Sequence, residues 1–344
     1  MSRVFPVSRT LAFVGLTSVC LLVSIGYVTR AAMQLRSQRT IANLTTSGAA
    51  VSIDGSPATG PQLLFRSTNP DSSHGRVMLA PLEGPEANRK TTPITGELVY
   101  FAGGCGVTLM ADRGVHTTYS AALFHSDFQM KPPFPLAGIP SRARVSTDGR
   151  YVAITVFVSG HSYAGTNFST ATTLIDSRSG ATIANLEEFK IIHGGVVTKA
   201  PRANFWGVTF ARESNRFYAT LSMGGVFHLV EGNIAERTVR TLRPGVECPS
   251  ISPDNTRVVY KKRESPNRWR LHVLDLATFK DKALQETRSV NDQVEWLDND
   301  HVLYALSNES GTGGPIESVW MVAVDGQGEA RIFANGASSP VVVR

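Results

Sequence analysis

One unit recurs along the chain from about residue 62 onward, and it constrains the fold more than any other feature of the sequence. VSTDGRYVAITVF (residues 145–157) aligns with ISPDNTRVVYKKR (residues 251–263), and segments 210–222 and 296–307 fit the same frame. Each has an apolar residue, a polar turn of about four residues and then a β-rich run. Asp-Gly and Asp-Asn tolerate the backbone conformation that a tight hairpin needs, so each unit predicts two antiparallel strands.

Further strands follow in the same units. TTLIDSRSGA, LHVLDLATFK and VWMVAVDGQGEA each place β-branched or aromatic residues before a polar turn, and a short run such as ARIFANG closes the unit. No stretch of this part shows the 3.6-residue period of an amphipathic helix. Such a unit, with strands joined by hairpins over about 40–50 residues, is one blade of a β-propeller.

The repeats predict six blades. Blades two to six are expected at residues 97–138, 139–190, 203–245, 246–288 and 289–336. The first blade shows two clear strands, LLFRS and RVMLAPL, and lacks an inner one, whereas residues 338–344 form a lone strand. We therefore expect an all-β fold, a six-bladed β-propeller over residues 61–344 that residues 338–344 close inside blade one.

The repeat has an S-P-D-N/G turn before a β-run and Leu-Asp after it, and in this it resembles the TolB-like propeller family. The resemblance covers nearly all of residues 60–344 and is clearest in blades three and five. It implies the six-bladed fold and, by analogy, an export-linked role in binding a partner.

An uncharged apolar segment, residues 10–29, precedes the repeats. Twenty helical residues span about 30 Å, the thickness of a bilayer's hydrocarbon core, so the segment predicts a transmembrane signal anchor. A cleaved signal peptide is the alternative. Residues 1–9 are then a short cytoplasmic N-terminus and residues 30–60 a flexible stalk. We expect a single-pass protein of the cell membrane with its propeller on the extracytoplasmic side.

The net charge of +6 comes mainly from the flanks of this segment. Five arginines precede the first acidic residue, Asp54, and the rest of the chain carries about +1. A nucleic-acid-binding domain needs a basic face of its own. We therefore expect no nucleic acid partner.

Two cysteines, Cys105 and Cys248, belong to the predicted propeller, and the third, Cys20, lies in the apolar segment. Export permits a disulfide between Cys105 and Cys248, but the blade assignment places them on different blades. A disulfide and two separate buried thiols both stay open at this stage.

A long loop, GHSYAG, follows the second strand of blade three. It departs from the G-x-S-x-G nucleophile elbow because its second glycine comes one residue late and no helix follows, so no catalytic serine is predicted. One interpretation is contact with a ligand or partner through His161, Tyr163 and Asn167. The other is a plain surface loop.

The only strong cluster of positive charge in the predicted propeller, KKRESPNRWR, forms a hairpin of blade five. The functional interpretation is contact with an anionic lipid or an acidic partner. The candidate contact residues are Lys261, Lys262, Arg263, Arg268 and Trp269. The alternative is a solvated hairpin.

The eight histidines are scattered without metal-ligand spacing and no Cys-x-x-Cys motif is present, so we expect no metal and no other cofactor. The leading hypothesis is a non-catalytic interaction module, tethered by one membrane helix, that binds an envelope protein or a wall component. The alternative is an enzyme or small-ligand sensor with its site in the central channel, where polar residues of the inner strands converge without a sequence motif.

Overall fold

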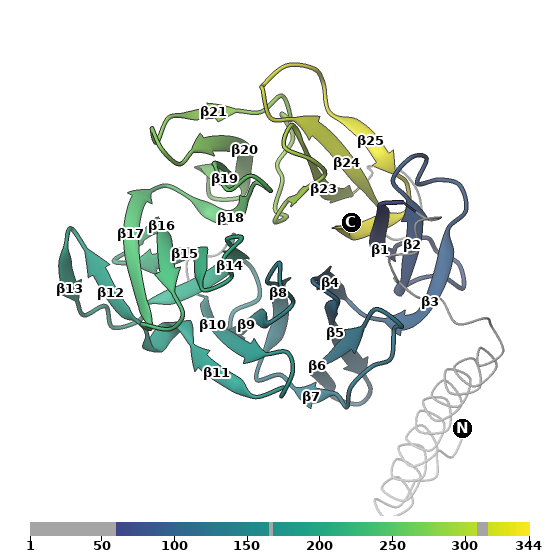
Figure 1. Cartoon of the computed structure of the whole chain (residues 1–344), viewed down its shortest axis with the longest axis horizontal. Coiled ribbons are helices and arrows are strands. Elements are labelled where there is room, and N and C mark those ends of the chain that lie inside the picture. Colours follow the sequence, from purple (N-terminus) through teal and green to yellow (C-terminus); the bar gives the residue numbers. More distant parts are fainter. Residues whose placement is uncertain (1–59, 165–167, 308–315) are drawn as a thin grey trace, which may run out of the picture. The chain divides into compact units, whose positions relative to one another are not determined.

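The computed structural model describes residues 60–164, 168–307 and 316–344, and these form six antiparallel sheets arranged around one axis (Figure 1). The predicted N-terminus, signal anchor and stalk, except for residue 60, lie outside the described residues. Within the described part, no helix combines the length and apolarity needed to cross a bilayer.

Each sheet is one blade, and its strands run from the axis outward. Blade one has β26 (Ala337–Val343), β1 (Gln62–Ser67), β2 (Arg76–Pro81) and β3 (Lys90–Thr95). Blade two has β4 (Leu98–Ala102), β5 (Cys105–Arg113), β6 (Thr117–His125) and β7 (Phe134–Pro135). Blade three has β8 (Ile139–Val145), β9 (Tyr151–Ser159), β10 (Ser169–Asp176) and β11 (Thr182–Asn185).

The other three blades continue in the order of the chain. Blade four has β14 (Asn204–Phe210), β15 (Arg216–Met223), β16 (Val226–Asn233) and β17 (Thr238–Pro244), with β12 (Lys190–His193) and β13 (Val196–Thr198) outside them. Blade five has β18 (Glu247–Ile251), β19 (Arg257–Ser265), β20 (Arg268–Asp275) and β21 (Asp281–Ala283). Blade six has β22 (Glu295–Trp296), β23 (His301–Ser307), β24 (Glu317–Ala323) and β25 (Arg331–Ala334).

The ends of the described ring meet in blade one. The last strand, β26, pairs antiparallel with the first, β1, from Gln62 opposite Val343 to Ser67 opposite Ala337. The innermost strand of blade one therefore comes from the far end of the sequence. Figure 1 shows this yellow strand beside the dark blue strands β1 and β2.

The repeated turn has one set of hydrogen bonds in blades three and five. Ser146 Oγ donates to Asp148 Oδ1 over 2.6 Å, and Ser252 Oγ donates to Asp254 Oδ1 over 2.5 Å. Each serine oxygen also accepts a hydrogen bond from the backbone N–H of the residue that begins the next strand, Tyr151 in β9 or Arg257 in β19. The Ser-x-Asp spacing thus locks the hairpin between the innermost strand and its neighbour.

The core lies between the blades. Six hydrophobic clusters of the described residues each join two adjacent blades, so every blade interface in the ring is apolar. A seventh cluster, which includes Tyr163, Trp206 and Trp269, lies near the axis between blades three, four and five. Aromatic side chains fill the wedge-shaped gaps that a ring of twisted sheets leaves.

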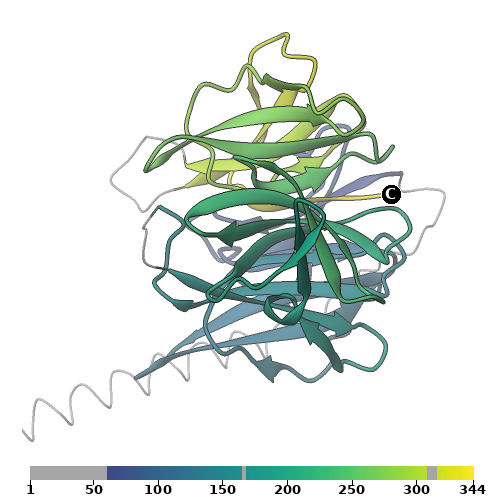
Figure 2. The same ribbon diagram turned by 90° about the vertical axis from the view of Figure 1, so that its left-hand side faces the viewer.

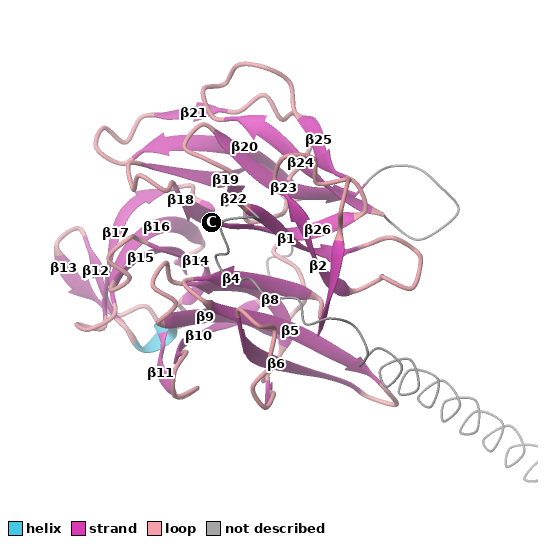
Figure 3. Ribbon diagram, turned by 45° about the vertical axis from the view of Figure 1, so that its right-hand side comes forward, coloured by secondary structure: helices cyan, strands magenta, loops and turns pink. Residues whose placement is uncertain are grey.

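One part of the sheets was not predicted from the sequence. A hairpin of β12 and β13 adds two strands to the outer edge of blade four, with β12 parallel to β17. This six-stranded sheet faces the viewer in Figure 2. A single helical turn, η1 (Leu186–Glu188), cyan in Figure 3, leads into the hairpin.

Cys105 and Cys248 are both free, buried thiols. They belong to separate clusters, one between blades two and three and the other near the axis. The disulfide that the sequence left open is therefore not formed, because the two thiols are buried in different parts of the ring.

Candidate functional site

The axis of the ring is crossed by side chains of the inner strands. Arg144 on β8 donates through Nη2 to the carbonyl oxygens of Gln293 and Val294, at 3.2 and 2.9 Å, across the ring in blade six. Gln293 Nε2 donates in turn to Val208 and Pro249, in blades four and five. These hydrogen bonds join opposite and neighbouring blades, so polar side chains close the middle of the axis.

A pocket remains at the end of the axis where β26 ends and β1 begins. Its volume is about 250 Å³. Residues of all six blades line it, among them Tyr100, Arg144, Arg212, Glu295 and Arg344. The lining contains three arginines and one carboxyl group, so the pocket favours an anionic group of a ligand or partner.

The floor of this pocket is a buried polar group. Tyr100 Oη donates to Glu295 Oε2 over 3.2 Å, and the Arg144 guanidinium lies 4.4 Å from the centre of the Tyr100 ring. Burial raises the pKa of Glu295, although Arg144 and the backbone N–H of Val342 act in the opposite direction. The floor therefore holds a carboxyl group that takes up protons more readily than an exposed glutamate.

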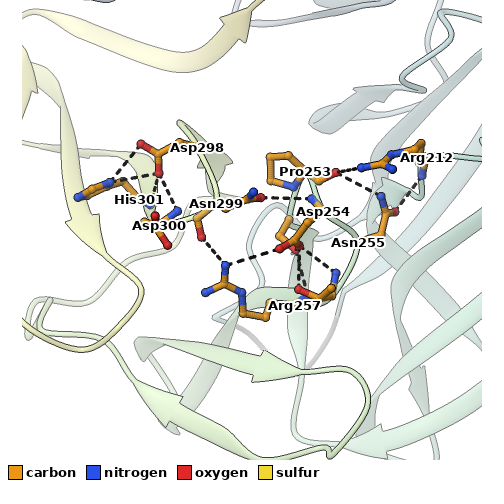
Figure 4. A network of polar contacts seen from close by, with 11 residues as sticks. Arg212, Pro253, Asp254, Asn255, Arg257, Asp298, Asn299, Asp300 and His301 are labelled. Carbon is orange, nitrogen blue, oxygen red and sulfur yellow. Dashed lines mark hydrogen bonds and ion pairs between the residues drawn. The ribbon is translucent and has the colours of Figure 1, made fainter.

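The rim of the pocket is a belt of linked turns. Thr147 Oγ1 donates to the carbonyl of Arg212, whose own N–H and Nη2 donate to Asn255 and Pro253 at 2.9 Å. Asp254 N–H then donates to Asn299 Oδ1 over 3.2 Å. Figure 4 shows the part of this belt from Arg212 through the Pro253–Arg257 turn to His301. Blades three to six are thus joined in sequence by the same turns that define the repeat, which fixes the shape of the rim.

The opposite end of the axis is closed by the two segments that the sequence singled out. Tyr163, in the long loop of blade three, is 2% exposed, and its carbonyl accepts a hydrogen bond from Arg263 Nη2 of blade five over 2.9 Å. The Lys261 ammonium lies 5.2 Å from the Tyr163 ring and 4.9 Å from the Trp269 ring. The predicted loop and the predicted basic hairpin therefore meet in one place.

We call this group the Tyr163 cluster; it consists of Arg142, Tyr163, Trp206, Glu247, Cys248, Lys261, Arg263 and Trp269. Glu247 and Arg263 form a bidentate pair with N–O distances of 2.8 and 2.9 Å, and Trp269 Nε1 donates to the same carboxylate. Burial lowers the pKa of Lys261, which is fully buried, and raises the pKa of Tyr163. The cluster is a layered arrangement of cations and aromatic rings.

The other predicted contact residues lie apart from the cluster. His161 is exposed, and Asn167 lies outside the described residues. Lys262 points to Asp281 of the outer strand, and Arg268 pairs with Glu264 at the tip of the hairpin. The interpretation of this segment as a solvated hairpin is wrong for Lys261 and Trp269, because strand alternation turns both side chains inward. In this conformation neither lies on a surface that a partner touches.

The charged residues of the inner strands were not predicted from the sequence. Arg142 and Arg144 stand two apart on β8 and therefore point to the same side of the strand. Glu247 and Glu295 begin the inner strands of blades five and six. The signal was present, because a charged residue on the innermost strand of a propeller points to the axis or to a blade interface. The described residues contain no group of three or more His, Cys, Asp or Glu side chains placed to hold a metal ion.

Comparisons with known proteins agree with this architecture. No protein-family model and no curated protein matches the chain. Among solved structures, TolB from Acinetobacter baumannii matches with a TM-score of 0.55 and 12% identity over 82% of this chain, which spans 66% of that TolB chain. A chain of a nidogen/laminin complex matches with a TM-score of 0.51 and 12% identity, over 82% of this chain and 98% of that one.

At these identities the similarities concern the fold alone. The described part of the chain is a six-bladed β-propeller, similar in fold to the TolB propeller.

Proposed function

We propose that the chain is a non-catalytic interaction module that binds an acidic segment of an envelope protein or a wall component at the pocket between Tyr100, Arg212 and Arg344. One observation carries the proposal: the axis is closed below this pocket, which leaves a shallow, arginine-lined recess inside a rigid rim. A recess of about 250 Å³ accommodates one or two side chains of a larger partner. The nidogen/laminin structure is likewise a complex of two proteins.

The proposal includes a location. The apolar segment 10–29 supports a single membrane anchor, with the propeller on the extracytoplasmic side. The start of β1 at Gln62 and the last residue, Arg344, lie at the end of the axis that carries the pocket.

Site-specific photocrosslinking in the native cell tests the contact face. A photoreactive residue at Thr147, which is exposed on the rim, is expected to give one crosslinked partner. Arg178, exposed on a turn of blade three outside the pocket lining, is the matched control and is expected to give none. A partner that crosslinks from His161 and not from Thr147 places the contact at the other end of the axis and contradicts the proposal.

An enzyme or small-ligand sensor is the second candidate, and the floor of the pocket favours it. Tyr100, Arg144 and Glu295 bring a hydroxyl, a guanidinium and a carboxyl of raised pKa together. Groups with shifted pKa values in a pocket are typical of catalytic and binding sites. Turnover of an envelope or wall substrate by the purified chain, lost in Glu295→Gln, would establish this function instead.

A further inference from the structure

Two like charges lie side by side in the Tyr163 cluster. Asn291 holds both: its carbonyl oxygen accepts a hydrogen bond from Arg142 Nη2, and its Oδ1 accepts one from Lys261 Nζ, each over 2.7 Å. Both cations also face the Tyr163 ring, at 5.3 and 5.2 Å from its centre. Neighbouring like charges repel strongly where water is excluded, and Lys261 is fully buried.

The nearby carboxylates are already engaged. Glu247 uses both oxygens for Arg263 and accepts a third hydrogen bond from Trp269. Asp292 accepts the backbone N–H groups of Gln293 and Ala305. Within residues 60–164, 168–307 and 316–344, neither Arg142 nor Lys261 forms an ion pair. The Cys248 side chain also lies within hydrogen-bonding reach of both cations. The positive charge of Arg142 and Lys261 therefore exceeds the negative charge of the carboxylates around them.

Hydrogen-bond donors are in excess as well. Arg142 Nε and Trp206 Nε1 are buried and have no acceptor among the residues that the structure describes. The Trp206 ring packs 5.2 Å from the Tyr163 ring, so this indole belongs to the same group. Buried donors without partners are rare, because each loses its hydrogen bonds to water and gains none in the protein. A water molecule would accept a hydrogen bond from such a donor but would leave the positive charge without a counter-ion. An anion both accepts the hydrogen bond and offsets the charge.

We propose that the Tyr163 cluster is a binding site for a small halide-like anion, held between the Arg142 guanidinium and the Lys261 ammonium. The anion is monatomic because the rings and the backbone of the cluster pack closely: Tyr163, Trp206, Cys248 and Trp269 are each at most 3% exposed. It joins blades three and five, since Arg142 lies on β8 and Lys261 on β19. This site is separate from the pocket at the other end of the axis.

Bromide tests the site directly. Crystals of the full chain grown with sodium bromide in place of chloride are expected to give an anomalous peak at the bromine edge between Arg142 and Lys261. A water-like density without anomalous signal at this position would overturn the proposal. So would an empty position with bromide ordered elsewhere.

Thermal unfolding of the full chain gives a second test in solution. At constant ionic strength, replacing gluconate by chloride is expected to raise the unfolding midpoint, because a ligand that binds only the folded state stabilises it. Lys261→Met keeps the apolar stem between the rings and is expected to lower chloride affinity on the order of tenfold or more. Lys262→Gln, one residue along and directed at Asp281, is the matched control and is expected to keep the full chloride response.

An equal chloride response in the wild type and Lys261→Met would contradict the proposal. Should Lys261→Met not fold, Trp206→Phe replaces it, because this change mainly removes the unpartnered indole N–H. Its chloride response is then expected to be weaker than that of the wild type, and an unchanged response would again count against the site.

Discussion

At the scale of single residues, the inner strands depend on backbone conformations that few residues adopt. Gly207, Cys248 and Ser339 all have positive φ, between 46° and 63°, at irregular positions of β14, β18 and β26. At Gly207 the next blade also approaches closely, since a Cβ there would lie 2.6 Å from Cys248 Cα. Gly207 therefore allows blades four and five to meet at the axis.

Gly207→Ala is expected to destabilise the propeller by about 2–4 kcal/mol, because a positive φ and a backbone clash add together. Urea unfolding measures the loss. Gly225→Ala is the matched control: Gly225 has a φ of +79° and open space around its Cβ position, so only the conformational cost of about 1 kcal/mol is expected. Equal losses in the two variants would show that the contact with Cys248 is not tight.

Glu187 makes the junction of blades three and four sensitive to pH. Burial raises its pKa to about 7, even though the backbone N–H groups of Thr172 and Phe205 donate to its carboxylate. Because the pKa of Glu187 is raised in the folded state, its carboxyl group contributes fully to the free energy of unfolding below about pH 4.5. This contribution is lost as the pH rises through 7. Glu187→Gln is therefore expected to be about 1–3 kcal/mol more stable than the wild type at pH 8.

The measurement is urea unfolding of both proteins between pH 4.5 and 8. The stability difference between wild type and Glu187→Gln is expected to change with pH over this range. Glu188→Gln, at the exposed neighbouring position, is the control and is expected to follow the wild-type curve. Parallel curves for Glu187→Gln and the wild type would show that the buried carboxyl does not titrate there.

At the scale of elements, the sequence predicted what local chemistry determines. The Ser-x-Asp turns and the β-rich runs after them are local, and the structure has blades two to six close to the expected ranges. The β12–β13 hairpin was missed because His-Gly-Gly-Val belongs to no repeat and its edge position depends on β17. The meeting of Tyr163 with Lys261 was also missed, since it depends on how blades three and five face each other across blade four.

One carboxylate adds to the backbone pairing that holds the short outer strand β21 to β20. Asp281 accepts hydrogen bonds from Tyr260 and Lys262 and contacts His272, and it pairs with Arg243 of blade four. Burial alone would raise its pKa, but the hydrogen bonds from Tyr260 and Lys262 lower it to about 2. A lowered folded pKa gives stability that is present above about pH 4 and lost as pH falls through 2.

Asp281→Asn is expected to cost about 1–2 kcal/mol at pH 6, because solvent screens part of this network. The cost is expected to disappear between pH 4 and 2, where the wild type also loses the negative charge. Chemical unfolding at several pH values measures both. Asp275→Asn, at the end of β20, is the local control, because the Asp275 carboxylate accepts hydrogen bonds from Ala277 and Thr278 and lacks the contacts to Tyr260 and Lys262. The hydrogen bonds from Thr278 also lower the pKa of Asp275, so this variant measures what a turn carboxylate alone contributes to the pH dependence. A constant difference at all pH values would contradict this account of Asp281.

At the scale of the whole molecule, one strand closes the ring. β26 pairs with β1, and its residues Ala337 and Val342 pack in the cluster between blades six and one. Val341 and Val343 pack in the cluster between blades one and two. Seven residues therefore complete two of the six blade interfaces, which is why removing them affects both sides of blade one.

A chain that ends at Gly336 is expected to lose cooperative unfolding and to become sensitive to proteolysis. Removal of Arg344 alone is the control, because β26 ends at Val343, and this variant is expected to stay folded. A synthetic peptide of residues 337–344 is expected to restore protection to the shortened chain. A shortened chain that unfolds as cooperatively as the wild type would show that β26 is dispensable.

The pairing of β1 with β26 also sets an order of events during biosynthesis. Leu63 and Phe65 of β1 are among the first propeller residues to leave the ribosome, yet their cluster includes Ala337 and Val342, which are among the last. Blade one must therefore wait until residues 337–343 have been translated before its inner edge is covered. A ribosome that stops early releases a chain with an open edge, which proteases and chaperones recognise. Closure of the ring in this way distinguishes chains that contain β26 from chains that lack it.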